Sequence, residues 1–193
     1  MSFYQLALFI HVMGALTLFS AVALNFASML RMLQSRNVLR LSDWARLGLQ
    51  AGRIIPIALL FIVGSGISMV STVWGWQTPW VDVVLATVIG HGIAVQAIEN
   101  PRLSKLHKEA LKAPVGPVPL NVHMLAHDEL MWTVDLTVTT TTVGIIFLMV
   151  VKPDLVLSLV AVGITLVIGL ALAVPFWLTD HAHVHATRSG MIA

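Results

Sequence analysis

The sequence of 193 residues contains no cysteine, and only 10% of its residues are Asp, Glu, Lys or Arg. The absence of cysteine excludes disulfides, thiolate metal sites, iron–sulfur clusters and cysteine nucleophiles. A soluble domain usually carries about 25% charged residues. The low charge therefore excludes an ordinary water-soluble protein, a disordered chain and a nucleic-acid binder. Apolar residues make up 58% of the chain, so the solvent that this composition fits is the lipid bilayer.

Long apolar runs divide the chain. A spanning helix needs about 20 mostly apolar residues, and five such runs lie at residues 3–30, 54–74, 80–98, 125–151 and 154–177. They predict an all-α integral membrane protein whose five transmembrane helices form a single bundle over residues 1–178. A histidine-containing tail follows at 179–193. The first run is too long for the apolar core of a signal peptide, and we expect it to remain as a spanning helix.

Basic residues gather in segments that this topology puts on one side of the membrane. Ten of the eleven Lys and Arg residues lie in the first and third links or in the tail, and Lys152 is the exception. Positive charges concentrate in cytoplasmic segments. The pattern predicts a multi-pass protein with its N-terminus outside and its C-terminus inside.

Two basic segments have helical patterns of their own. Residues 40–53 contain Ser42 and Asp43, which favour the start of a helix. The segment is predicted to form a short surface helix or an extension of the second span. Residues 101–111 begin with proline and have apolar residues at helical spacing, which predicts an amphipathic helix at the inner face. Asn121 suits the N-cap of the fourth helix.

Small and polar residues recur at helical spacing along the first run, which is typical of a helix-packing face. His11 belongs to this face and lies about 10 Å from the outer boundary, while His91 of the third run lies about 15 Å deep. Two histidines at similar depth on separate helices are what b-type haem needs as axial ligands. His11 and His91 are therefore candidate haem ligands. The alternative is that each is a buried histidine with a local hydrogen bond.

The fourth run is the most polar of the five. Asp135 lies within the inner leaflet and needs a partner there, for which Asn25 and Gln96 are the candidates. With Thr139 and Thr142 these residues could form a path for protons or cations. The alternative is a buried structural hydrogen bond, with the threonines bonded to their own helix.

Six of the eight histidines fall on the predicted cytoplasmic side. His123 and His127 are four residues apart on the predicted helix, and the tail supplies His181, His183 and His185. Imidazoles at such spacing bind nickel, copper or zinc, which predicts a site for a transition-metal ion. The alternative is a solvated tail without metal.

Two short segments resemble a known family. Residues 8–15, Leu-Phe-Ile-His-Val-Met-Gly-Ala, resemble the opening of a family of small uncharacterised prokaryotic membrane proteins, and residues 144–153 are similar to its fourth-helix ending. That family is related to copper-resistance D-type membrane proteins and to a bacterial membrane protein that oxidises protoporphyrinogen. The likeness covers about residues 3–175.

The resemblance implies a helical bundle in a prokaryotic cytoplasmic (inner) membrane, in which His11 is associated with haem or the protein handles metal at the membrane. Its oxidising members carry a lysine inside a helix, whereas every lysine here lies in a loop or at a boundary, which argues against an enzyme. We expect a haem- or metal-associated redox or accessory subunit, covered by other membrane subunits or by further copies. The alternatives are a small transporter or permeation unit that uses the polar face of the fourth helix, and a structural membrane scaffold.

Overall fold

The computed structural model describes residues 2–190, and for residues 179–190 it describes the backbone alone. Its helical elements, in chain order, are α1 (Phe3–Leu33), α2 (Val38–Met69), η1 (Val70–Trp74), α3 (Pro79–Ala94), η2 (Val95–Glu99), α4 (Asn100–Lys112), α5 (Leu120–Ala126), α6 (Glu129–Val151) and α7 (Leu155–Gly190). The two η elements are π-helical turns that continue neighbouring α-helices. Residues 2–190 contain no β-strand, so the all-α prediction is confirmed.

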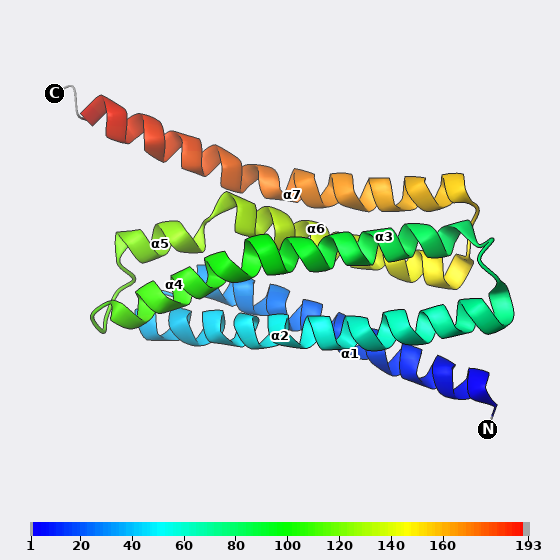
Figure 1. Cartoon of the computed structure of the whole chain (residues 1–193). Coiled ribbons are helices and arrows are strands. Elements are labelled where there is room, and N and C mark those ends of the chain that lie inside the picture. Colours follow the sequence, from blue (N-terminus) through cyan, green and yellow to red (C-terminus); the bar gives the residue numbers. More distant parts are fainter. Residues whose placement is uncertain (1, 191–193) are drawn as a thin grey trace.

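Five helical stretches in the described part of the chain are long and apolar enough to cross a membrane. They lie side by side, with the N-terminus, the α2–α3 turn and the α6–α7 turn at one end of the bundle (Figure 1). We call this the N-terminal end. The other end, called here the basic end, holds the α1–α2 turn, α4 and α5. This arrangement indicates a multi-pass membrane protein.

The helices begin and end differently from the sequence prediction. Residues 40–53 extend the second span, as one of the two readings had it, but the N-cap of α2 is Asn37, whose side chain accepts from the Leu39 amide. Ser42 and Asp43 therefore lie within the helix. Asn121 is not an N-cap either, because it lies inside the short helix α5. The next helix, α6, is capped by Asp128, whose side chain accepts from the Met131 amide at 2.8 Å. Local capping chemistry was available at several positions, and tertiary packing selected among them.

The third span continues without a break into the basic segment. It runs from Pro79 to Lys112 through the π-turn η2, which ends two residues before Pro101. Proline has no amide hydrogen for the preceding helical turn, and a wider π-turn next to it lets the helix continue. As a result α4 packs against α2. Its buried residues are Leu103, Leu106 and Ala110.

Buried apolar residues form three clusters along the bundle. The basic-end cluster includes Met29, Leu41, Leu103, Leu106 and Trp132. The middle cluster consists of Leu18, Ala21, Val22, Ile55, Ala58, Ile62, Val95, Val134 and Val138. The cluster at the N-terminal end consists of Trp80, Val83, Val84, Val88, Ile145, Leu148 and Val162. These clusters hold the five long helices together, while most of the apolar surface of α7 faces outward.

Candidate functional site

A buried polar cluster lies where the basic-end and middle clusters meet. On α1, Asn25 stands between Val22 of the middle cluster and Met29 of the basic-end cluster. Two acidic residues lie at the same boundary between the clusters: Glu99 at the end of η2 and Asp135 on α6. Along its helix, each has residues of the middle cluster on one side and of the basic-end cluster on the other. We call Asn25, Glu99 and Asp135 the carboxyl cluster. Three separate spans thus place one polar residue each at the same level.

The three side chains contact one another through a single nitrogen atom. Asn25 Nδ2 donates to Glu99 Oε1 at 2.6 Å and to Asp135 Oδ1 at 2.9 Å. Asn25, Glu99 and Asp135 are only 5%, 1% and 2% exposed, respectively. The amide thereby uses both of its hydrogens on carboxyl oxygens. Because it holds the two acidic groups close together, their electrostatic interaction is strong in this apolar setting.

Each member of the carboxyl cluster also has an oxygen without a hydrogen-bond partner among the described residues. These atoms are Asn25 Oδ1, Glu99 Oε2 and Asp135 Oδ2. Within that part of the chain, no Lys, Arg or His forms an ion pair with Glu99 or Asp135. Buried acceptors that lack both a donor and a counter-ion are costly. A proton on one of the carboxyl groups would supply a donor and remove one of the charges.

Glycines on α2 allow the polar side chains to approach. A Cβ atom added at Gly48 would lie 2.7 Å from Ser28 Oγ and 3.1 Å from Asn25 Oδ1. One added at Gly52 would lie 2.7 Å from Asn100 Oδ1. The two glycines are four residues apart and face α1 and the third span, which is the close-packing role of small residues in membrane helices.

Of the two partners predicted for Asp135, Asn25 forms a hydrogen bond with it, whereas Gln96 bonds to other residues. Gln96 Nε2 donates to the carbonyl of Gly52 at 3.4 Å, and its Oε1 accepts from Asn100 at 3.0 Å. Thr142 bonds back to the Val138 carbonyl, whereas Thr139 Oγ1 is buried without a partner in the described structure. The fourth-span residues are thus only partly connected to the carboxyl cluster.

The sequence reasoning missed Glu99. The predicted third span ended at residue 98, so Glu99 was assigned to a cytoplasmic link. The available signal was Pro101, because a proline inside a helix lacks the amide hydrogen for the preceding turn, and a π-turn before it lets the helix continue past Glu99. Such turns frequently occur at functional sites, and here the turn carries Glu99 into the core.

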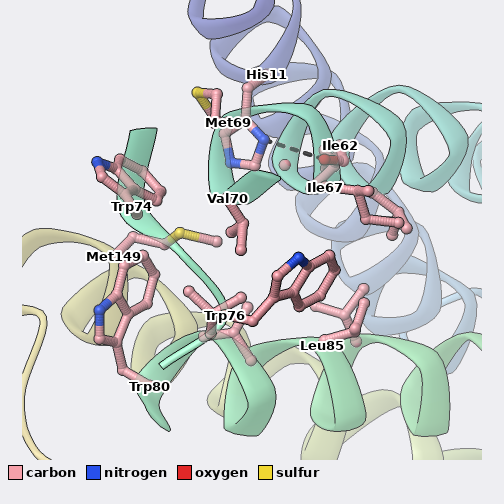
Figure 2. Close-up of a pocket in the computed structure, with 15 residues that line it drawn as sticks. His11, Ile62, Ile67, Met69, Val70, Trp74, Trp76, Trp80, Leu85 and Met149 are labelled. Carbon is pink, nitrogen blue, oxygen red and sulfur yellow. Dashed lines mark hydrogen bonds between the residues drawn. The ribbon is translucent and has the colours of Figure 1, made fainter. Parts of the chain in front are cut away.

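The two membrane histidines lie in different cavities. His11 lines a hollow at the N-terminal end, together with Trp74, Trp80 and Met149 (Figure 2). His91 lines a smaller cavity walled by Leu18 and Val22, two to three helical turns further along α1 than His11 by residue number. Val88 alone lines both cavities. Each imidazole therefore has its own surroundings.

This arrangement does not fit a haem held between the two histidines. The cavity beside His11 has a volume of only about 60 Å³, and the cavity beside His91 has a volume of about 30 Å³. The space beside Gly14 on α1 is filled by Ile62 and Phe61 of α2, and a Cβ added at Gly14 would lie only 3.0 Å from Ile62 Cγ1. The haem assignment stays a prediction.

The histidines of the basic end do not form a chelate in the described residues. His127 Nδ1 donates to the His123 carbonyl at 2.9 Å, and the two rings stack with centroids 4.2 Å apart. Among the described residues, no group of three or more His, Asp or Glu side chains is placed to hold a metal ion. The side chains of His181, His183 and His185 lie outside the described residues.

Comparisons with known proteins add no further constraint. No protein-family model, curated protein or solved structure matches this chain. The family resemblance read from residues 8–15 and 144–153 therefore remains a prediction.

Proposed function

We propose that the chain is a small proton-translocating unit of a membrane, in which the Glu99–Asp135 pair binds and releases the proton. The observation that carries the proposal is the contact of both carboxyl groups with one amide nitrogen, Asn25 Nδ2, at 2.6 and 2.9 Å. Ionisable residues inside a membrane bundle are costly and commonly mark ion and proton pathways. This cluster has two of them, without a basic partner in the described structure.

The chemistry of the pair suits proton exchange. Two ionised carboxylates at such close quarters in an apolar site repel each other strongly, so one proton between them stabilises the site. The uncontacted oxygens Glu99 Oε2 and Asp135 Oδ2 are the atoms that would take or give that proton. Asn25 cannot exchange a proton itself, and its role is to hold the two carboxyl groups in register.

A proton would have to enter through one apolar cluster and leave through another. The basic-end cluster closes one side of the carboxyl cluster and the middle cluster closes the other, as expected for an occluded site. On the middle-cluster side, the buried hydroxyls of Thr139 and Thr141 follow Asp135 along α6 and have no partner in the described part of the chain. The π-turn η2 carries Glu99, and a change in the hydrogen-bond register of this turn would open the occluded site toward one side or the other.

The charge pattern gives the proposed direction. We place the basic end in the cytoplasm of a prokaryotic cell, because Lys and Arg concentrate in cytoplasmic segments. The carboxyl cluster then lies nearer the cytoplasmic surface, and the N-terminal end lies outside. The long outward-facing surface of α7 would contact lipid, a second copy or another membrane subunit.

Proton flux into proteoliposomes tests the proposal. The purified protein is reconstituted around a pH-sensitive dye, and a potassium gradient with valinomycin provides the driving potential. We expect dye acidification with the unaltered protein, and flux at the level of protein-free vesicles with Glu99→Gln and with Asp135→Asn. Both replacements keep the side-chain shape and the oxygen that accepts from Asn25.

Glu109→Gln is the matched control, because Glu109 is a carboxylate of the same continuous helix that pairs with Lys112 on the surface at 2.8 Å. Its flux should equal that of the unaltered protein. Flux that persists in both Glu99→Gln and Asp135→Asn, with correctly folded protein, would refute the proposal and leave the cluster a structural role.

A further inference from the structure

The hollow beside His11 is an apolar recess at the N-terminal end of the bundle. Its cavity volume is about 60 Å³ with Trp76 in place, below the range of about 300–1,000 Å³ of small-molecule sites, so an aromatic ring enters only when this exposed side chain moves outward. His11, Trp74, Trp76, Trp80, Val70 and Met149 are among its walls (Figure 2). The proposed proton site uses none of these residues, and the hollow therefore needs an explanation of its own.

The hydrogen bonds of His11 determine which ring nitrogen carries a proton. His11 Nδ1 lies 3.1 Å from the Ile62 carbonyl and 3.2 Å from Ser65 Oγ. A carbonyl only accepts, and the Ser65 hydroxyl already donates to the Phe61 carbonyl. Nδ1 is therefore the protonated nitrogen of the neutral ring, and Nε2 keeps its lone pair.

The Nε2 atom of His11 has no hydrogen-bond partner among the described residues. Figure 2 shows the ring held at one edge by Ile62, with its other nitrogen turned toward the side of Val70 and the hollow. The remaining walls are almost entirely apolar. The hollow thus offers one hydrogen-bond acceptor in an apolar surrounding, which selects a ligand that has one hydroxyl donor on an otherwise apolar body.

The walls of the hollow favour a flat ring. Trp74 and Trp80 have ring centroids 5.6 Å apart, and the Lys152 ammonium lies 4.9 Å from the Trp74 ring centroid, which holds that side in place. Trp76, by contrast, is 58% exposed and forms the outer wall. Aromatic side chains bind flat rings by stacking or edge contacts, and Trp76 can move to admit one.

We propose that this hollow binds the ring of a lipid-soluble phenol or hydroquinone, whose hydroxyl group donates a hydrogen bond to His11 Nε2. The ring would lie among Trp74, Trp76 and Trp80, and its alkyl substituent would extend through the mouth past the exposed Ile67 into lipid. The proposal concerns binding only. It is independent of the proton site, because the two sites share no residue.

Binding can be measured by the quenching of tryptophan fluorescence in the full-length protein in lipid nanodiscs. The probes are a decyl-substituted benzohydroquinone and its dimethyl ether, which has the same ring and tail but no hydroxyl donor. A net hydrogen bond contributes about 0.5–1.5 kcal/mol, so the hydroquinone should bind about two- to thirteenfold more tightly than the ether. In His11→Phe the two probes should bind equally.

Two further variants make the result independent of any folding defect in His11→Phe. Trp76→Ala removes an exposed wall of the hollow. It should weaken the binding of both probes while keeping the preference for the hydroquinone. His91→Phe alters the other cavity and should leave both affinities unchanged. Equal affinity of the two probes for the unaltered protein would overturn the proposal. A Soret band on haem addition that disappears in His11→Phe would also overturn it, because His11 would then be an iron ligand.

Discussion

The carboxyl cluster and the His11 hollow are opposite solutions to placing a polar side chain inside a membrane bundle. In the cluster, polar groups from three helices meet each other, and each is at most 5% exposed. In the hollow, one imidazole is anchored to its neighbouring helix by Nδ1 and presents Nε2 to an apolar space. The first arrangement suits an internal exchange of protons, and the second suits a ligand that arrives from the bilayer.

The difference also shows where the fold depends on polar contacts. The cluster connects α1, η2 and α6, so a change there affects three spans at once. The His11 hydrogen bonds connect only α1 and α2. These two helices already pack extensively against each other. Substitutions in the cluster should therefore cost much more stability than substitutions at the hollow.

The largest expected effect is that of Asn25→Leu. Leucine removes both donors and leaves two buried acidic side chains without their shared partner, which should lower the free energy of unfolding by about 3 kcal/mol. Thr17→Leu is the matched control on α1, because Thr17 is exposed and bonds only to its own helix. That change should stay within about 0.5 kcal/mol. Unfolding of both variants in the same detergent measures the difference, and equal stabilities would show that the cluster does not hold the spans together.

A smaller effect separates two glycines of α2. Gly48→Ala places a methyl group 2.7 Å from Ser28 Oγ and 3.1 Å from Asn25 Oδ1, and it should destabilise the protein by about 1–3 kcal/mol. Gly64→Ala meets nothing within 4 Å. Because alanine favours a helix over glycine by about 1 kcal/mol, this variant should be unchanged or more stable. Thermal unfolding compares the two, and the reverse order would mean that Asn25 is not packed against Gly48.

The sequence predicted the features that depend on local composition. Five apolar runs became five helices, and the polar position 135 was identified because an acidic residue within such a run is unusual. The choice of Asn25 over Gln96 could not be predicted, because it depends on how the third span rotates after its π-turn. The same turn moved Glu99 from an expected surface link into the core.

The histidines illustrate the same limit. Counting residues from the helix starts placed His11 and His91 at similar depths, but depth along a helix does not determine which cavity a side chain enters. That depends on the packing of α1 against α2, where Gly14 receives Ile62 and Gly66 accommodates the His11 ring at 3.5 Å from an added Cβ. Such contacts arise between residues about fifty positions apart, and no local pattern predicts them.

The most direct test of the proton site is the infrared spectrum of the purified protein in lipid at neutral pH. The account predicts a carbonyl band from a protonated carboxyl group, which shifts on exchange into heavy water and disappears in the Glu99→Gln, Asp135→Asn double variant. The Glu109→Gln variant should keep the band. A spectrum of the unaltered protein without any protonated-carboxyl band would contradict the account, because the Glu99–Asp135 pair would then hold no proton to translocate.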